Sequence, residues 1–439
     1  MNQPTAYVLS CGDELLFGHT VDTNAAWLAR ECTGLGWRIL GHRTVGDVTR
    51  DIAEAFREAS SRADVVILTG GLGPTNDDRT RQALAEALGV ELYEDPRALS
   101  EVEDVFRRFN RPMSAVNRVQ ALIPRGTTRI FNPDGTAPGI RAALGNAVIY
   151  VLPGVPREMR GMFNGTVKPE LEKTHGGRRE ALRRLRLFGK GESDVGEAIR
   201  HLMGERDNPE VGTTVADGII TVRIYAKGDT LDQALAIADA AEAGIREALG
   251  GEVFGVEDET LASTVVEALK KSGGILCVAE SCTGGMIAGQ IVDVPGASTV
   301  FMEGTVAYSD AAKIHRLGVD PSGIERHGAV SRETAIGMAR GALERASVKT
   351  LPAYSLAVTG IAGPDGGAPE KPVGTVWIAC GAIDRDGGGT MRSRLYNTVA
   401  DRYGTRLRAT HAALDLLRRI LVGLPLDPGT EETPWRPGE

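Results

Sequence analysis

The stretch Ile275–Gly285 reads ILCVAESCTGG, and its pattern decides the fold of the C-terminal part of the chain. It begins with a continuous apolar run, which is typical of a buried strand, and ends in two glycines. A strand that opens through a glycine turn into a helix places the turn at the carboxyl end of a sheet, where open α/β folds bind ligands. Ser281 stands in that turn, and the start of the following helix offers N–H groups to an anion or oxyanion.

The same serine has a simpler interpretation, because Ser281 and Thr283 could merely cap the following helix. A serine nucleophile needs a base, and Lys313 follows a strand expected at 304–307. A desolvated lysine can deprotonate serine, although a lone lysine at a helix start is often only a solvated charge. Cys282 is the rival nucleophile. The other candidate bases are histidines that do not stand at a strand end beside a glycine turn: His315, His327 and His411.

A second glycine-rich loop follows a strand at 357–367, which reads AVTGIAGPDGG. Such a loop suits a phosphate or a ribose, although a long hairpin connection would look the same. Another buried strand is expected at 373–379. These elements continue the alternation of strands and helices in the C-terminal part.

The N-terminal part shows a similar alternation. Residues 6–10 and 63–69 read as buried strands, and a helix between them has apolar side chains at i, i+3, i+4 and i+7, namely Ile52, Ala55, Phe56 and Ala59. This pattern predicts a mostly parallel sheet covered on both faces. The second strand breaks into glycines whose N–H groups suit a phosphate. Asp77 and Asp78 follow at a helix start, where they could hold a divalent cation or simply cap the helix.

The middle of the chain has a different rhythm. A strand at 185–188, a helix at 193–203, two strands within 211–226, a helix at 231–249 and a strand at 252–256 give the order β-α-β-β-α-β of ferredoxin-like modules. We therefore predict an α/β protein with two α/β sandwich domains joined by a small α+β ferredoxin-like module. The expected boundaries are 1–172, 173–257 and 258–424, with a disordered, proline-rich tail at 425–439.

Length and composition limit the class of protein. A chain of 439 residues is too long for one hydrophobic core, and its formal net charge of −8 argues against non-specific nucleic-acid binding. The basic run at 178–186 is interpreted as a solvated strand edge or linker, with an RNA or partner contact as the alternative. Five scattered cysteines without a C-x-x-C pair favour a reducing cytoplasm over a disulfide framework or a zinc site. We see neither a signal peptide nor a membrane span.

The C-terminal part contains five motifs, in this order: AESCTGG (279–285), VAYSxxxK (306–313), GAVS (328–331), VTGIAGPDGG (358–367) and KPVGTVWIA (371–379). Together they resemble the CinA C-terminal family over about 260–421. That family includes the PncC-type amidases, which convert nicotinamide mononucleotide and water to nicotinic acid mononucleotide and ammonia.

The resemblance implies roles for individual residues. Ser281 would attack the carboxamide carbon, with Lys313 and Tyr308 handling protons. Contacts with the oxyanion and the nucleotide would come from Glu280, Thr283, Gly284, Gly285, Thr359, Gly360, Gly363 and Arg402. Two positions depart from the family pattern, because Asp310 stands where asparagine is usual and 399–402 (VADR) keeps only part of F-x-G-D-R. The retained Arg402 could pair with the substrate phosphate.

A second ordered set of motifs lies near the N-terminus: GDELL (12–16), DTN (22–24), TGGLGPTNDD (69–78), NPDGTAPG (132–139) and LPGVPREM (152–159). It resembles the molybdopterin-binding, MoaB/MogA-like fold as it occurs in CinA proteins, some of which are metal-dependent ADP-ribose pyrophosphatases that yield AMP and ribose 5-phosphate. The implied metal and catalytic candidates are Asp13, Glu14, Asp77, Asp78 and Glu158. The implied substrate contacts are Gly70, Gly71, Gly73, Asn132, Gly135 and Thr136.

The resemblances together imply a cytoplasmic, bifunctional enzyme that recycles pyridine nucleotides and uses a divalent metal ion in its first domain. Its partners would be small-molecule nucleotide substrates, and a homodimer is expected because the middle module has no other evident task. Two alternatives stay open. The first domain could only bind a pterin or a nucleotide, or the chain could be an interaction protein of competence or DNA repair, although direct DNA binding is disfavoured by its acidic balance.

Overall fold

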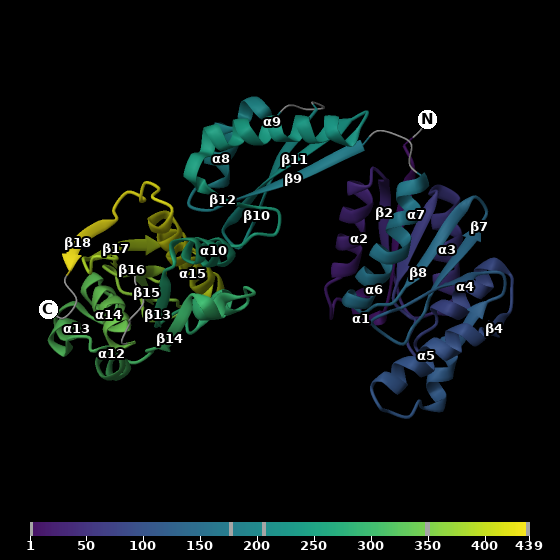
Figure 1. Ribbon diagram of the computed structural model, residues 1–439, viewed down its shortest axis with the longest axis horizontal. Coiled ribbons are helices and arrows are strands. Elements are labelled where there is room, and N and C mark those ends of the chain that lie inside the picture. The colour runs from purple at the N-terminus through teal and green to yellow at the C-terminus, as the bar shows by residue number, and fades with distance from the viewer. Residues whose placement is uncertain (1–2, 175–178, 204–207, 347–351, 436–439) are drawn as a thin grey trace. The chain divides into compact units, whose positions relative to one another are not determined.

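The computed structural model describes residues 3–174, 179–203, 208–346 and 352–435 (Figure 1). The chain divides into two compact units. One contains residues 1–181 and 226–237, and the other contains residues 182–225 and 238–439.

A six-stranded mixed sheet with the order β2-β1-β3-β8-β7-β6 forms the centre of the first unit. Its strands are β1 (Thr5–Cys11), β2 (Arg38–Val45), β3 (Val65–Thr69), β6 (Thr128–Ile130), β7 (Gly139–Leu144) and β8 (Ala147–Leu152). The first four strands in the order are parallel, which confirms the predicted parallel sheet for them. The last two are antiparallel, because Gly145, at a φ of 60°, closes a hairpin between β7 and β8.

Helices cover both faces of this sheet. One face carries α2 (Thr23–Gly34), α6 (Pro156–Met162) and α7 (Lys168–Thr174), and the other carries α3 (Thr49–Arg62) and α4 (Thr80–Leu88). The predicted amphipathic helix is α3, and its four apolar residues are all buried. The remaining elements are α1 (Asp13–Leu16), α5 (Pro96–Arg108) and a small sheet of β4 (Leu92–Glu94) and β5 (Leu122–Pro124).

The middle module has the predicted order of elements: β9 (Arg179–Leu187), α8 (Glu192–Ala198), β10 (Glu210–Ala216), β11 (Ile219–Gly228), α9 (Leu231–Leu249) and β12 (Val253–Val256). Its sheet order is β10-β11-β9-β12, as in ferredoxin-like modules. The basic run lies on β9, an inner strand, where Arg183 pairs with Asp239 and Arg184 with Glu257. The run is therefore neither a strand edge nor a linker, and its first residue, Arg178, lies outside the described residues.

The C-terminal domain is a second mixed sheet, with the order β14-β13-β15-β16-β17-β18. Its strands are β13 (Ile275–Glu280), β14 (Phe301–Val306), β15 (Ala353–Gly360), β16 (Thr375–Ile383), β17 (Gly389–Asn397) and β18 (Glu431–Trp435). The strands β14, β13 and β15 are parallel, and the other pairs are antiparallel.

Two layers of helices enclose this sheet (Figure 1). One face packs against α10 (Leu261–Ser272), α11 (Met286–Val292) and α15 (Arg402–Leu421), and the other against α12 (Asp310–Leu317), α13 (Pro321–His327) and α14 (Arg332–Arg345). Alternate residues of β13 serve the two cores, with Leu276 and Val278 on the first face and Cys277 and Ala279 on the second. The predicted α/β sandwich is thereby confirmed.

The expected disorder of the tail from residue 425 is wrong for the described residues 425–435. Strand β18 pairs antiparallel with β17, which would otherwise be the edge of the sheet. Ion pairs of 2.9 Å between Arg392 and Glu432 and of 2.8 Å between Arg332 and Glu431 hold it there. Pro434 is tolerated because β18 is itself an edge strand. Residues 436–439 lie outside the described part.

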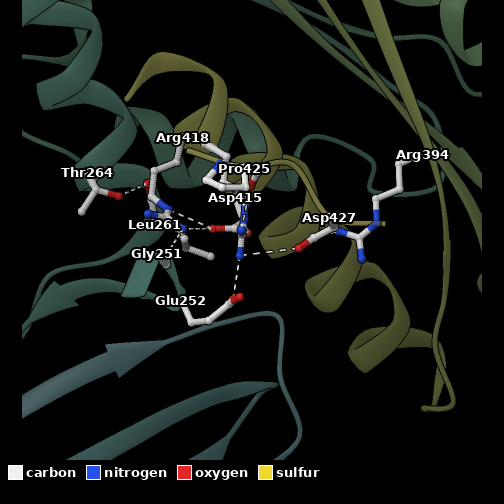
Figure 2. Close-up of polar contacts among 10 residues, drawn as sticks. Gly251, Glu252, Leu261, Thr264, Arg394, Asp415, Arg418, Pro425 and Asp427 are labelled. Carbon is white, nitrogen blue, oxygen red and sulfur yellow. Dashed lines mark hydrogen bonds and ion pairs between the residues drawn. The ribbon is translucent and has the colours of Figure 1, made fainter. Parts of the chain in front are cut away.

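A buried network of charges joins the end of the middle module to α15 (Figure 2). The Asp415 carboxylate accepts hydrogen bonds from Arg418 at 2.6 Å and from Arg419 at 2.7 Å. Arg419 also pairs with Glu252 at 2.6 Å, and Arg418 donates to the Gly251 carbonyl at 2.7 Å. Removing one partner of such a buried set is costly, because the others stay buried without compensation. The network therefore fixes the 251–252 turn on α15.

Across the described residues, we find no helix that combines the length and the apolar character needed to cross a bilayer. The five cysteines are free thiols, and all are buried. No disulfide joins them, and within the described chain no three potential metal ligands are gathered together.

Candidate functional site

Ser281 lies just past the end of β13, where three parallel strands end side by side. Its N–H donates to the Val358 carbonyl of β15 at 2.9 Å. On the other flank, the N–H of Ala307 donates to the Glu280 carbonyl at 2.8 Å. The residues that follow β13, β14 and β15 therefore meet at one edge of the sheet. The predicted strand-turn-helix placement of Ser281 is confirmed, since β13 precedes it and α11 follows.

The side chain that caps α11 is Glu280. Its carboxylate accepts hydrogen bonds from the backbone N–H groups of Gly285 at 3.0 Å, Ile287 at 3.1 Å and Ala288 at 2.9 Å, and the residue is 1 % exposed. A substrate contact through this carboxylate was predicted and is wrong, because the carboxylate is buried against the helix start. Among the described residues, the Ser281 hydroxyl makes no hydrogen bond, so helix capping does not account for this serine.

The expected oxyanion donors are only partly available. The N–H of Gly284 donates to the Ser281 carbonyl at 3.1 Å, and the N–H of Gly285 is taken by Glu280. The predicted roles of the Gly284 and Gly285 N–H groups as oxyanion donors are therefore wrong. Of the three predicted donors, the Thr283 N–H remains. Both glycines have positive φ angles, 61° and 94°, which explains why the turn needs them.

Arg406 of α15 supports this turn from behind. Its Nε donates to the Cys282 carbonyl at 3.0 Å, and its Nη2 donates to the Thr283 carbonyl at 2.8 Å. No motif marked Arg406 in the sequence. It was missed because it reaches the turn only through the packing of α15 on the sheet.

Lys313 is buried and lies close to the same edge of the sheet. It is 2 % exposed, and its Nζ donates to the Tyr308 carbonyl at 3.1 Å and lies 3.5 Å from Asp310 Oδ1. A solvated surface charge is therefore excluded. Among the described hydrogen bonds, none joins Lys313 to the Ser281 hydroxyl.

Tyr308 and Arg402 link the strand ends to the glycine-rich loop. Arg402 Nη2 donates to the Tyr308 hydroxyl at 2.8 Å, and Arg402 Nη1 donates to the Gly363 carbonyl. Tyr308 is 59 % exposed, so its ring borders solvent. Three residues that the sequence pattern places far apart are thus brought together.

The first residues of the same loop, Thr359 and Gly360, have structural roles. The Thr359 hydroxyl is buried and donates to the Ala329 carbonyl at 2.7 Å. At Gly360, a Cβ would lie 2.7 Å from Val376 Cγ2, so close strand packing requires the glycine there. The predicted substrate contact by the Thr359 side chain is therefore wrong. Any substrate contact of this segment has to come from the loop after Gly360.

The rival nucleophile, Cys282, and the three candidate histidine bases are not placed to take part in catalysis with Ser281. Burial raises the pKa of the Cys282 thiol to about 12, which leaves it protonated and a poor nucleophile at neutral pH. His411 is packed against Phe188, and burial lowers its pKa. His327 Nδ1 lies 3.9 Å from Glu333, and His315 is exposed on α12. None of the three histidines is hydrogen-bonded to Ser281 within the described chain.

A cavity of about 460 Å³ lies at the carboxyl ends of β1 and β3 in the first unit. The residues of its lining that the sequence singled out are Glu14, Gly70, Gly71, Gly73, Asp77 and Asp78. Asp13, Asn132, Gly135, Thr136 and Glu158 are not among the described residues that line it. The structure therefore separates the predicted residues into two groups.

The Gly70–Gly73 turn is only partly open to a phosphate. The N–H of Gly70 donates to Leu152 at 3.0 Å and that of Gly73 to Asp78 at 2.7 Å, so their predicted phosphate contacts are corrected and Gly71 remains. A Cβ on Gly71, whose φ is 65°, would lie 2.2 Å from Thr80 Oγ1.

Arg81 places a positive charge beneath this turn. It is 1 % exposed and donates to the Gly73 carbonyl at 3.1 Å and to the Leu72 carbonyl. Burial lowers its pKa to about 10, which leaves it charged at neutral pH. Arg81 is not among the described residues that line the cavity, whose charged members are the carboxylates of Glu14, Asp22, Asp47, Asp77 and Asp78. Its charge therefore offsets part of the negative charge around the turn.

The five acidic residues do not form the predicted metal site. Asp78 accepts hydrogen bonds from the N–H groups of Gly73 at 2.7 Å and Thr75 at 2.8 Å, so it closes the turn. The N–H of Asp13 donates to the Asp47 carboxylate at 3.0 Å, and the N–H of Asp47 donates to the Asp13 carboxylate at 3.2 Å. Within the described chain, no three His, Cys, Asp or Glu side chains are gathered to hold a metal ion. As they lie, these side chains do not form a site for a resident ion, so a divalent cation used by this domain would have to arrive together with a phosphate-bearing substrate.

Glu158 belongs to a separate turn. Its carboxylate accepts a hydrogen bond from Asn132 Nδ2 at 2.7 Å, and a Cβ on Gly135 would lie 2.1 Å from its carboxyl carbon. Asn132 also donates to the Ala137 carbonyl at 3.0 Å. These contacts shape the 132–137 loop, so the structure gives Glu158, Asn132 and Gly135 a structural role.

Asn24 is a cavity residue to which the sequence assigned no role. Its Nδ2 donates to the Gly154 carbonyl at 2.7 Å, while its Oδ1 is buried without a partner among the described residues. The residue lines the cavity. The signal that could have found it is its place in the DTN motif.

Comparisons with known proteins show the family to which the chain belongs. The family described as "CinA C-terminal domain" matches residues 258–421, "Probable molybdopterin binding domain" matches 7–173, and "Damage-inducible protein CinA KH domain" matches 182–255. A putative competence-damage inducible protein of Clostridium beijerinckii is 40 % identical over 417 residues, which cover 95 % of this chain and 99 % of that protein. The chain belongs to the CinA family.

The chain is also similar to further proteins of the CinA family. A putative competence-damage inducible protein of Moorella thermoacetica is 41 % identical over 418 residues, with 95 % of this chain and 98 % of that protein covered. The protein CinA with unknown function from Thermoplasma acidophilum, known from a crystal structure, is 35 % identical. It covers 38 % of this chain and 99 % of its own, with a TM-score of 0.36.

The comparison adds a KH assignment to the middle module, which the sequence pattern described only as ferredoxin-like. KH domains clamp a nucleic-acid backbone with a G-x-x-G loop. The matched residues 182–255 contain no G-x-x-G tetrad. The module therefore lacks the motif on which nucleic-acid binding by KH domains usually depends.

Proposed function

We propose that the C-terminal domain hydrolyses the carboxamide of nicotinamide mononucleotide to nicotinic acid mononucleotide and ammonia, with Ser281 as the nucleophile. The observation that carries this proposal is that the two adjacent residues at the end of β13 have different hydrogen bonds. Glu280 caps α11, and the neighbouring Ser281 hydroxyl has no structural hydrogen bond among the described residues. The substrate is proposed from the motifs that the chain shares with the PncC-type amidases of the CinA family.

The chemistry takes place in two stages. The Ser281 oxygen attacks the carboxamide carbon and passes its proton to Lys313 or Tyr308. The C–N bond then breaks, and ammonia leaves with a proton from the same groups. Water attacks the resulting ester, releases the carboxylate and restores the serine hydroxyl. Arg402 is proposed to bind the substrate phosphate, because it lies beside Tyr308 and Gly363.

The test is ammonia release from nicotinamide mononucleotide by the full chain. Ser281→Ala is expected to abolish it, and Cys282→Ala is the matched control because it changes the adjacent residue and removes the rival nucleophile. Full release by Ser281→Ala, or loss of release in Cys282→Ala alone, would overturn the assignment.

The first domain carries a second candidate function, the hydrolysis of ADP-ribose to AMP and ribose 5-phosphate. One observation favours it. The cavity is lined by the Gly70–Gly73 turn, which Arg81 contacts from behind, and by the carboxylates of Glu14, Asp22, Asp47, Asp77 and Asp78. A pyrophosphate held at this turn would need divalent cations between it and these carboxylates, as in metal-dependent phosphate hydrolysis.

Incubation of the chain with ADP-ribose and a series of divalent cations tests this second function. AMP formation with at least one cation is the expected result. If ADP-ribose binds but no AMP forms with any cation, the first domain is a binding module for a nucleotide or a pterin instead.

A further inference from the structure

Arg406 stands on α15, and its guanidinium lies against the turn that follows Ser281. Its Nε donates to the Cys282 carbonyl at 3.0 Å, and its Nη2 donates to the Thr283 carbonyl at 2.8 Å. The two carbonyls belong to consecutive peptides, so one planar group of donors holds both of them. These contacts fix the two peptides that come directly after the Ser281–Cys282 peptide.

The orientation of the two peptides follows from their hydrogen bonds. Both are trans, and the C=O and N–H of a planar trans peptide point in opposite directions. The Thr283 carbonyl faces Arg406, and the N–H at the other end of the same peptide, that of Gly284, donates to the Ser281 carbonyl at 3.1 Å. The Cys282 carbonyl also faces Arg406, so the Thr283 N–H points away from the guanidinium as well. Arg406 therefore lies at the negative ends of two peptide dipoles.

The charge of Arg406 acts on these dipoles with little compensation. An arginine stays protonated in proteins, and none of the described ion pairs includes Arg406. A hydrogen bond from a charged donor polarises the peptide that accepts it, which makes the N–H at the other end of that peptide a stronger donor. Thr283 is 0 % exposed, so water neither competes for its N–H nor screens its field.

We propose that Arg406 is a positioning residue for the reaction at Ser281, because it orients and polarises the Cys282–Thr283 peptide whose N–H end stabilises the developing oxyanion. In this step the Ser281 oxygen bonds to the carboxamide carbon, and the C=O π pair moves onto the carbonyl oxygen. The pair returns when the C–N bond breaks and ammonia leaves. A fixed dipole stabilises such an oxygen well because it needs no reorganisation during the reaction. The inference rests on the proposed amidase function for its substrate.

Steady-state release of ammonia from nicotinamide mononucleotide by the full chain is the first test. Arg406→Gln is expected to lower kcat about tenfold, less than the loss of about 100-fold that is usual for a donor in direct contact, and to change KM by less than about twofold. Arg406→Lys keeps the charge but cannot hold both carbonyls, so it should lose about threefold.

Arg408→Gln is the matched control for the loss of a charge on α15. Arg408 lies two residues further along the helix, and its side chain lies beside the β10–β11 turn, since a Cβ on Gly218 would be 3.3 Å from Arg408 Cγ. This variant should keep the kcat of the unaltered chain. An equal loss of kcat in Arg408→Gln and Arg406→Gln would overturn the proposal.

The thioamide analogue of nicotinamide mononucleotide separates polarisation of the peptide from a mere displacement of Ser281. Sulfur is a weaker hydrogen-bond acceptor than oxygen, so turnover of the thioamide depends less on the Thr283 N–H. Arg406→Gln is expected to lose about tenfold on the amide and only about twofold on the thioamide. Equal losses on both substrates would show that Arg406 only maintains the shape of the turn, and would overturn the proposal.

Acetylation of Ser281 by p-nitrophenyl acetate tests the same step without a nucleotide. The reaction passes through an oxyanion of the same kind, and peptide mass spectrometry locates the acetyl group. Acetylation is expected to be about tenfold slower in Arg406→Gln than in the unaltered chain or in Arg408→Gln. If Arg406→Gln does not fold, Arg406→Lys replaces it in every comparison, with an expected loss of about threefold.

These outcomes distinguish the inference from the amidase function. Slower acetylation in Arg406→Gln, with no hydrolysis of nicotinamide mononucleotide by the unaltered chain, would support the role of Arg406 and overturn the amidase function. Unchanged acetylation and unchanged ammonia release in Arg406→Gln would overturn the role of Arg406 and leave the amidase function in place. If the unaltered chain neither releases ammonia nor becomes acetylated at Ser281, both are overturned.

Discussion

The two glycine turns of this protein look alike in sequence and differ in what their carboxylates do. Each follows a buried parallel strand, and each has an acidic residue whose carboxylate accepts backbone N–H bonds. In the C-terminal domain the acid is Glu280, which precedes the turn and caps α11. In the first domain it is Asp78, which follows the turn and closes it through Gly73 and Thr75.

The residue that accepts the backbone N–H bonds is not available for catalysis, so the two turns differ in which side chain remains free to react. In the C-terminal turn, the capping is done by a neighbour, and Ser281 has no structural hydrogen bond within the described chain. In the first domain, the capping is done by Asp78, one of the residues expected to bind a metal. In both turns the acidic residue has a structural role, and it is the hydrogen bonds rather than the sequence that reveal this role.

The largest effect on this comparison is expected from Glu280→Ala. It would leave three N–H groups at the start of α11 buried and unpaired, which should lower the free energy of unfolding of the C-terminal domain by about 3 kcal/mol. Hydrogen exchange followed by mass spectrometry measures this domain separately from the first. Glu280→Gln, which keeps one accepting oxygen, should lose less, and an unchanged stability in Glu280→Ala would contradict the capping role.

The next effect is expected from alanine at corresponding glycines. Gly71→Ala would force a Cβ to 2.2 Å from Thr80 Oγ1 at a φ of 65°, which should cost about 2 kcal/mol. Gly284→Ala has a φ of 61°, but its Cβ would meet only the flexible end of Arg406 at 3.2 Å, so about 1 kcal/mol is expected. Thermal unfolding of both variants checks the order, and equal losses would show that the two turns are packed alike.

A smaller effect is expected from Asp78→Ala, which removes the acceptor for Gly73 and Thr75. The loss should be about 1 kcal/mol, the usual value for a lost cap, in the stability of the first domain. Because Asp78 is assigned to the turn, Asp78→Asn should keep most of this stability through its remaining amide oxygen. If Asp78→Ala leaves stability unchanged while ADP-ribose turnover stops, Asp78 is a catalytic or metal-binding residue after all.

The smallest structural effect concerns Cys282. Because burial raises its pKa to about 12, the thiol should stay protonated and react slowly with iodoacetamide at pH 8 in the native chain. Burial favours the neutral thiol, so its contribution to stability is present below the unfolded pKa near 9.0 and is lost as the pH rises toward about 12. Mass spectrometry of the alkylated peptide checks this, and rapid alkylation at pH 8 would contradict it.

The sequence predicted the fold well where periodicity was strong. The α/β sandwiches, the order of the middle module and the turn around Ser281 all follow from apolar runs, helical spacing and glycines. The tail was mispredicted because its prolines and acidic residues suggested disorder. In the structure, residues 431–435 instead form strand β18, which pairs with β17.

The roles of individual side chains were harder to predict, because they depend on contacts that local sequence does not determine. Glu280 and Ser281 are adjacent, and nothing in the pattern indicates which of them turns toward α11. Arg406 reaches Cys282 across 124 residues of sequence. Asp78 was assigned to a metal because its chemistry permits it, but its oxygens accept hydrogen bonds from the N–H groups of Gly73 and Thr75 and from the Thr75 hydroxyl.

The central claim is that Ser281 is the residue that forms a bond with substrate, and rapid quenching during turnover of nicotinamide mononucleotide tests it most directly. Intact-mass and peptide analysis should find the nicotinyl mononucleotide acyl group on the peptide that contains Ser281, and this adduct should be absent in Ser281→Ala. An adduct on Cys282, or ammonia release at the full rate by Ser281→Ala, would contradict the account.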